Sequence, residues 1–183
     1  CRSPYWLDPI PLTDPSSITV VAPNFKRRLS GVTSTIVQLV PLQARSIGIA
    51  ALGPGLPNTL PKLRWRDLPH LWRRPNGRPF RIWHARRNTE MLAGVVLRDI
   101  LRMPMRLLFT SAAQRHHSGW TRFLISRMDA VVATSERSRA FLKVPARVVM
   151  HGIDCEWFRP DGPMPSSPFT QRLASRKIVG CSG

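Results

Sequence analysis

Short apolar runs alternate along the chain with segments of helical spacing. Runs of β-branched and aliphatic residues, typical of buried strands, occur at residues 18–23, 47–52, 80–85, 105–109, 129–135 and 148–150. Helices are predicted between them at 32–43, through apolar positions 91 to 100, at 119–128 and at 136–142. We expect Ser30, Ser135 and either Asn88 or Thr89 to cap three of these helices.

The regular order of strands and helices predicts an α/β fold. Such alternation is typical of a Rossmann-like parallel sheet with helices on both faces. Residues 1–17 are Pro-rich and predict an irregular tail, followed by one domain over 18–165. Residues 166–183 are expected to be a linker and the first strand of another domain, because 177–183 resembles a buried strand without partners. The sequence is therefore expected to be part of a longer protein.

Positive charge dominates the composition. The sequence has 28 Lys and Arg against 10 Asp and Glu, a net charge of +18, and its lysines are Lys26, Lys62, Lys143 and Lys177. The apolar share of 43% excludes a charge-driven disordered chain. No apolar run is long enough to predict a membrane span, and no secretory signal opens the sequence. The arginine excess fits nucleic acid, phosphate-bearing ligands or an anionic membrane surface, and composition leaves all three open.

The cysteines and histidines do not predict a metal site. Cys1, Cys155 and Cys181 are widely spaced, which is typical of reduced thiols in a cytosolic protein. The adjacent His116 and His117 lack Cys or carboxylate partners at ligand spacing.

The chemically unusual residues follow the predicted strands, and parallel sheets bind ligands beyond the carboxyl ends of their strands. Together with one loop histidine, they make the predicted ligand-binding set: Ser30, Gly31, His84, Arg86, Arg87, Thr110, Ser111, His116 and Ser135. Backbone N–H groups at Gly31 can bind an anion, or the glycine serves only the turn. Arg86 and Arg87 offer planar forks to phosphate or carboxylate. Glu90 can pair with either arginine instead, which would make the group a structural ion cluster.

Two further stretches form a predicted basic surface. Lys26, Arg27 and Arg28 adjoin the Ser30–Gly31 turn, where they attract an anion or form a solvated face. The Pro-rich connection over 54–79 has little periodicity and is predicted to be a long loop. Its cations complete the basic surface: Arg64, Arg66, Arg73, Arg74 and Arg78.

Several motifs follow one another in a fixed order. They are His84-Ala85-Arg86-Arg87-Asn88-Thr89-Glu90, Phe109-Thr110-Ser111-Ala112, Asp129-Ala130-Val131-Val132-Ala133-Thr134-Ser135, and Val149-Met150-His151-Gly152-Ile153-Asp154 with Phe158-Arg159-Pro160. This order resembles the amino-terminal half of retaining glycosyltransferases of family four, which have the GT-B fold. With residues 20–39 added, the sequence is similar in particular to lipopolysaccharide core mannosyltransferases.

The resemblance implies an enzyme with two Rossmann-like domains and an active site between them. Residues 18–165 would then form the acceptor-side domain, and 166–183 would begin the donor-binding domain. The implied reaction transfers mannose, with retention, from GDP-mannose to a lipopolysaccharide core acceptor on lipid A, without metal or other cofactor. Ser30 and Gly31 would approach the donor phosphates, and the other strand-end residues would hold the acceptor. The family's donor loop and paired glutamates do not occur in these residues, so the chain alone is expected to be inactive.

Such an enzyme is expected in the cytoplasm, peripheral at the inner face of the cytoplasmic membrane. Its arginines would meet anionic lipid there. The alternatives are a basic nucleic-acid-binding domain, or a membrane-association domain without catalysis. No nucleic-acid partner is expected, because the arginines are spread over loops and helices and no RNA-binding sheet pattern occurs.

Overall fold

The structure is a computed structural model that describes residues 14–26, 31–57 and 60–150. All of these residues lie in one compact unit that ends at Met150. Several predicted features fall outside the described residues: most of the 1–17 tail, Arg27, Arg28, Ser30, the motif over 151–160, the domain boundary at 165 and the strand at 177–183.

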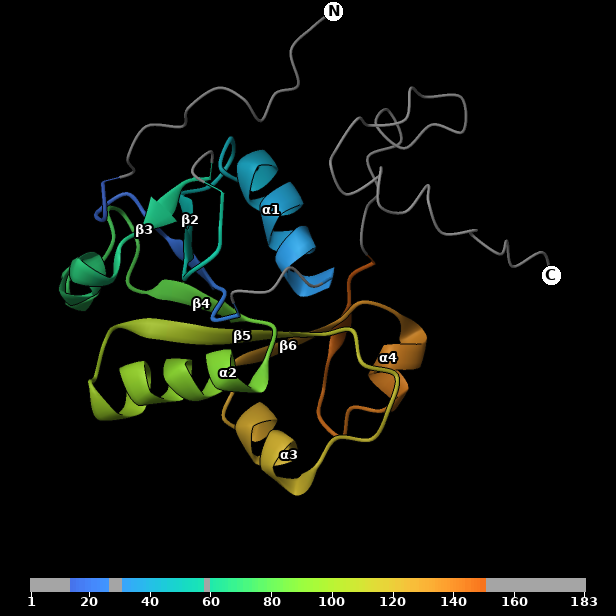
Figure 1. Cartoon of the computed structure of the whole chain (residues 1–183). Coiled ribbons are helices and arrows are strands. Elements are labelled where there is room, and N and C mark those ends of the chain that lie inside the picture. Colours follow the sequence, from blue (N-terminus) through green and yellow to red (C-terminus); the bar gives the residue numbers. More distant parts are fainter. Residues whose placement is uncertain (1–13, 27–30, 58–59, 151–183) are drawn as a thin grey trace, which may run out of the picture. The chain divides into compact units, whose positions relative to one another are not determined.

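A parallel sheet of seven strands forms the centre of this unit (Figure 1). The strands are β1 (Val20–Pro23), β2 (Ile49–Leu52), β3 (Lys62–Leu63), β4 (Arg81–Ala85), β5 (Met105–Ser111), β6 (Ala130–Ala133) and β7 (Arg147–Val148). Their order is β3-β2-β1-β4-β5-β6-β7, and each pair of neighbours is parallel. The predicted α/β fold with a Rossmann-like parallel sheet is confirmed.

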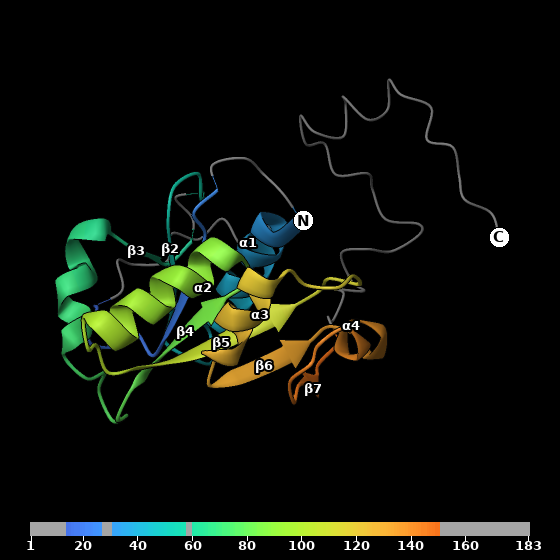
Figure 2. The ribbon, with the colours of Figure 1, turned by 90° about the horizontal axis from the view of Figure 1, so that it is seen from below.

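Helices cover both faces of the sheet, as predicted. They are α1 (Gly31–Gln43), the 3₁₀ helix η1 (Trp65–Trp72), α2 (Asn88–Val95) with its π-helical continuation η2 (Val96–Ile100), α3 (Gly119–Ser126) and α4 (Glu136–Ala140). Figures 1 and 2 show α1 on one face and α2 and α3 on the other. Among the described residues, no helix is long and apolar enough to cross a membrane.

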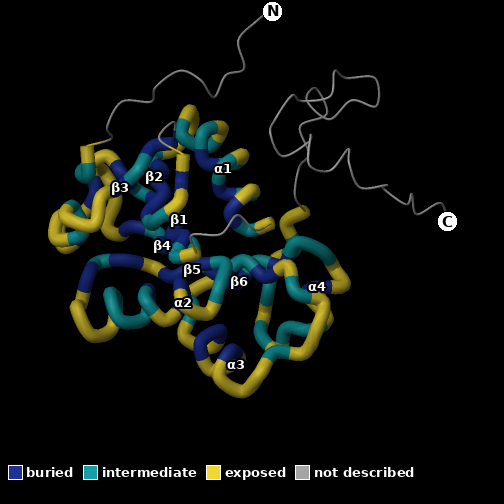
Figure 3. The backbone as a smooth tube through the Cα atoms, viewed as in Figure 1, coloured by how far each residue is buried: buried dark blue, intermediate teal, exposed yellow. Residues whose placement is uncertain are grey.

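Two apolar cores lie on the two faces of the sheet. Figure 3 shows the buried residues concentrated along the central strands. Successive side chains of a strand point to opposite faces, so neighbouring residues of β1 enter different cores. Val20 packs in the cluster of Ile36 from α1, whereas Val21 belongs to the cluster of Met91 from α2 and Leu124 from α3. The continuous apolar runs of the central strands are explained by burial on both faces.

The prediction of a structureless connection over 54–79 is wrong, because β3 and η1 lie within it. Prolines interrupt the apolar periodicity there, and Pro69 lies inside η1 itself. The end of η1 is held by Arg81, which is only 1% exposed. Its guanidinium donates to the carbonyls of Ile18 (2.9 Å), Leu71 (3.1 Å) and Arg73.

The predicted cap of α2 is also wrong. Arg87, and not Asn88 or Thr89, is the N-cap residue. The Asn88 amide instead donates to the Thr121 hydroxyl on α3, at 2.8 Å. The predicted cap of α4 is confirmed, because the Ser135 hydroxyl accepts a hydrogen bond from the Ser138 N–H at 3.0 Å.

Candidate functional site

The carboxyl ends of the parallel strands lie at one edge of the sheet. From β1 the chain continues to β2, which lies on one side of β1 in the sheet. From β4 it continues to β5, which lies in the opposite direction, so the strand order reverses between β1 and β4. Ligands of such sheets bind at this reversal. Asn24 follows β1, and Arg86 and Arg87 follow β4. The candidate site is therefore the carboxyl edge around β1, β4 and β5.

Asn24, which the sequence analysis did not select, organises this edge. It is fully buried, and its amide donates to the Lys26 carbonyl at 3.0 Å. Its Oδ1 accepts from the Thr33 hydroxyl (3.1 Å) and from the Arg87 guanidinium (2.9 Å). Gly53 permits the close approach of the neighbouring turn, because a Cβ there would lie 1.9 Å from the Asn24 carbonyl oxygen. Asn24 could have been identified from its position directly after a strand, where parallel sheets bind their ligands.

Arg87 belongs to the structural ion cluster that the sequence left open as an alternative. Its guanidinium lies 3.4 Å from the Glu90 carboxylate, which is fully buried. The other Glu90 carboxylate oxygen accepts from the Arg86 N–H at 2.8 Å. Burial raises the pKa of Glu90, and the Arg86 N–H and the charges of Arg87 and Arg86 oppose that rise. Arg87 therefore positions the start of α2 rather than presenting an open fork to a ligand.

Arg86 has a different environment from its neighbour. One terminal nitrogen of its guanidinium is buried and has no hydrogen-bond partner among the described residues. Burial lowers the pKa of Arg86, and the charge of Arg87 adds to this, while Glu90 acts in the opposite direction. A guanidinium with a buried, unused N–H is suited to a phosphate or carboxylate.

Two further buried polar atoms, one in β5 and one in the loop that follows it, also lack a partner within the described part of the chain. They are the hydroxyl oxygen of Ser111, a residue that is 2% exposed, and Nε2 of His117. Burying a polar atom without a hydrogen bond costs about 1–3 kcal/mol, so such atoms suit a polar ligand. The sequence placed Ser111 in the site but chose His116 over His117.

His84 and Thr110, both predicted site residues, lie side by side on β4 and β5. His84 Nε2 is 2.7 Å from the Thr110 hydroxyl. Burial, with a smaller contribution from Arg86, lowers the pKa of His84 to about 3. The imidazole is therefore neutral near pH 7 and acts as a hydrogen-bonding group, not as a cation.

The other predicted site residues in the described part of the chain are Gly31, Ser135 and His116. Gly31 begins α1, and the Ser135 hydroxyl serves the cap of α4. His116 is exposed, and its ring packs edge-on against Phe141 at 5.2 Å between centroids. Within the described residues, no three His, Cys, Asp or Glu side chains gather as a metal site would require.

The basic residues include the exposed cations of the predicted basic surface and a separate group of arginines that pair with aspartates. The exposed members of the predicted basic surface are Lys26, Arg64, Arg66, Arg73, Arg74 and Arg78.

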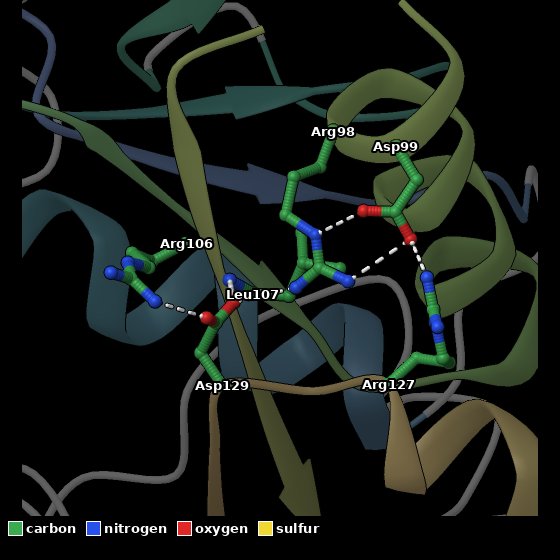
Figure 4. Close-up of polar contacts among 6 residues, drawn as sticks. All are labelled: Arg98, Asp99, Arg106, Leu107, Arg127 and Asp129. Atoms are coloured by element: carbon green, nitrogen blue, oxygen red, sulfur yellow. Dashed lines mark hydrogen bonds and ion pairs between the residues drawn. The ribbon is translucent and has the colours of Figure 1, made fainter. Parts of the chain in front are cut away.

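The paired arginines lie near the starts of β5 and β6 (Figure 4). Arg98 contacts both Asp99 (2.6 Å) and Asp129 (2.7 Å). Arg106 also binds Asp129 (2.7 Å), and Arg127 binds Asp99 (2.6 Å). This ion network is structural, because each of its arginines is paired with an aspartate.

Comparison with known proteins gives no matching family model and no matching solved structure. The lipopolysaccharide core biosynthesis mannosyltransferase LpsB of Rhizobium meliloti (strain 1021) is 57% identical over 177 residues, which are 94% of this chain and 50% of that protein. The lipopolysaccharide core biosynthesis mannosyltransferase LpcC of Rhizobium leguminosarum bv. viciae is 56% identical over 173 residues, 94% of this chain and 49% of that protein. The chain spans about half the length of these curated relatives. Over nearly its whole length, the chain is thus a relative of lipopolysaccharide core mannosyltransferases, which confirms the resemblance expected from its motifs.

Proposed function

We propose that the protein containing this chain transfers mannose from GDP-mannose, with retention, onto a lipopolysaccharide core acceptor. The observation that carries the proposal is the 57% identity to a lipopolysaccharide core mannosyltransferase over 94% of the chain. The parallel sheet and the polar residues at its carboxyl edge are consistent with one sugar-binding half of a GT-B enzyme. In this proposal, residues 18–165 are the acceptor-side domain and the donor-binding domain begins at 166–183.

The carboxyl edge provides groups suited to a phosphorylated sugar acceptor. Arg86 would bind a phosphate or carboxylate, because its buried guanidinium retains an unused N–H. Ser111 and the neutral His84–Thr110 pair would hydrogen-bond sugar hydroxyls. Gly31 at the start of α1 would lie near the donor phosphates, where helix N–H groups favour negative charge. The reaction would need no metal or other cofactor, because cationic side chains and helix starts can stabilise a leaving diphosphate.

The proposed acceptor lies at an anionic membrane. The protein would act in the cytoplasm, as a peripheral protein at the inner face of the cytoplasmic membrane. The exposed arginines between β3 and β4 would supply attraction to its lipids that decreases with salt.

Transfer by the intact protein tests this proposal. Purified protein is given GDP-mannose and a lipopolysaccharide core acceptor that lacks the mannose, and the anomeric configuration of the product is read by NMR. The Arg86→Ala variant is expected to raise the acceptor KM about ten- to a hundredfold, the loss expected for one charged hydrogen bond. Arg122→Ala, at an exposed position on α3, is the matched control and should leave the KM unchanged. Absence of mannosyl transfer by the wild-type protein would contradict the proposal.

A further inference from the structure

One side of the domain displays large apolar side chains. Trp65, Trp72, Leu92, Ile100 and Leu101 are 54%, 47%, 42%, 69% and 40% exposed, respectively. We call these five residues the η1–η2 surface. Apolar side chains of this size that gather on a surface usually mark an interaction site.

The five residues form one continuous surface because η1 lies beside α2 and η2. At one end, the Trp72 indole N–H donates to the Leu101 carbonyl at 2.7 Å. At the other end, Trp65 and Leu92 line the same apolar cavity of about 340 Å³, together with Leu97. Figure 2 shows η1 beside the C-terminal end of this helical segment.

Exposed arginines flank this apolar surface. Arg64, Arg66, Arg73 and Arg74 lie on η1 or directly beside it, and all are exposed. In the described part of the chain, Arg66 alone among these four makes an ion pair, a 3.9 Å contact with Asp67. Trp and aliphatic side chains surrounded by arginines fit the interface of an anionic bilayer, where indoles lie among the headgroups and guanidinium groups reach the phosphates.

The backbone is irregular at the end of this surface formed by η2. η2 is a π-helical turn, and Arg102, which follows Leu101, has a φ of 51°. Non-glycine residues rarely adopt that region, and such conformations cluster at functional segments.

We propose that the η1–η2 surface is the membrane-docking face of the protein. Trp65, Ile100 and Leu101 enter the interface of an anionic bilayer, while the flanking arginines bind lipid phosphates. Charge favours lipid over a second copy of the chain, because two such surfaces would bring like charges together. The identity of the partner rests on the proposed function. Phe25 follows Asn24 and stacks on Trp65 at 5.7 Å between centroids, so this face adjoins the candidate site.

Binding to vesicles tests the assignment in the intact protein. Co-sedimentation is measured with vesicles of phosphatidylglycerol and phosphatidylcholine in equal parts, and with phosphatidylcholine alone, at low and high salt. Trp65→Ser/Ile100→Ser changes two residues that are more than half exposed, and should weaken binding to the anionic vesicles about tenfold. Arg73→Gln/Arg74→Gln should weaken it about fivefold for each charge at low salt, and less at high salt. Trp120→Ser/Phe123→Ser on α3, at positions 53% and 54% exposed, is the matched control and should bind as the wild type does.

Unchanged binding by the Trp65→Ser/Ile100→Ser variant, or an equal loss in the α3 control, would overturn the proposal. A dimer that this variant dissociates, without loss of vesicle binding, would also overturn it and assign the surface to a second copy. Mannosyl transfer to a water-soluble, deacylated acceptor is measured in parallel and should persist in the docking variants. Absence of that transfer in the wild type contradicts the proposed function and leaves the vesicle result intact.

Discussion

At the scale of single residues, burial and partners give identical side chains different tasks. Arg81 is buried and holds backbone carbonyls, whereas Arg87 is paired with Glu90 and Asn24. Arg86, next to Arg87 in sequence, keeps a buried N–H without a partner among the described residues. The adjacent arginines were equivalent candidates in the sequence, and their environments separate a positioning residue from a candidate ligand-binding residue.

Substitution should separate the two arginines by their effects on stability. Arg87→Ala leaves the buried Glu90 carboxylate without its ion pair, and should lower the free energy of unfolding by about 3 kcal/mol. Arg86→Ala should lower it by less, about 1 kcal/mol, because the Arg86 side chain makes no hydrogen bond or ion pair within the described residues and only its longer-range attraction to Glu90 is lost. Urea unfolding of the intact protein measures both.

A second substitution provides the control for this comparison. Glu90→Gln in the Arg87→Ala background removes the unpaired charge and should restore part of the lost stability. Equal urea midpoints for the two alanine variants would contradict the division of roles.

At the scale of elements, α2 packs on β4 through a glycine inside the helix. A Cβ at Gly94 would lie 2.7 Å from Trp83 Cδ1 and 3.0 Å from Leu107 Cδ2. The Trp83 ring is 1% exposed, and its indole N–H donates to the Glu90 carbonyl at 2.8 Å, so it has little room to move. Close packing against Trp83 therefore requires glycine at position 94, although glycine has a low helix propensity.

Gly94→Ala should consequently destabilise the protein by about 1–3 kcal/mol, because the added methyl overpacks the core. Propensity alone predicts a gain of about 1 kcal/mol from the same change. Thermal unfolding distinguishes the two signs. Gly119→Ala in α3 is the control, because nothing lies within 4 Å of its added Cβ, and it should be neutral or stabilising. A stabilised Gly94→Ala variant would show that α2 does not depend on this contact.

At the scale of the whole domain, titratable groups at two edges of the sheet make its stability depend on pH. At the carboxyl edge, burial lowers the pKa of His84 to about 3 from an ordinary value of 6.5. At the opposite edge, the hydrogen bond from Arg98, with smaller contributions from Arg127, lowers the pKa of Asp99 to about 2 from 3.8. In both cases the unfolded chain binds protons at a higher pH than the folded chain, so acid favours unfolding.

Stability should therefore decrease in two steps as the pH falls. His84 contributes a decrease between pH 6.5 and about 3, with a slope of at most about 1.4 kcal/mol per pH unit. Asp99 contributes between pH 3.8 and about 2, where its ion pairs are lost on protonation. Urea unfolding at a series of pH values measures both steps. His84→Asn should flatten the first step and leave the second, and Asp99→Asn should do the reverse. A His84→Asn profile parallel to the wild type would contradict a neutral, buried His84.

Much of the fold could be predicted from neighbouring residues. The apolar runs located six of the strands, because strand and helix periodicity are properties of adjacent side chains. The strand-end rule also placed His84, Arg86 and Ser111 correctly at one edge, because parallel strands end together. The helix η1 was missed because prolines in and around it interrupt the helical spacing of apolar residues. Asn24 was missed because a single polar residue after a strand is not by itself distinctive in the sequence.

The sequence by itself thus determined the α/β class, six of the strands and the edge that holds the candidate site. Only the tertiary structure decided which residues meet there. Asn24 and Arg87 are 63 residues apart, and they bond because β1 and β4 are neighbours at the point where the strand order reverses. The same holds for the η1–η2 surface, whose residues are joined only when η1 packs beside α2. Local patterns encode the elements, but contacts between distant residues depend on how the sheet orders its strands, which no short segment contains.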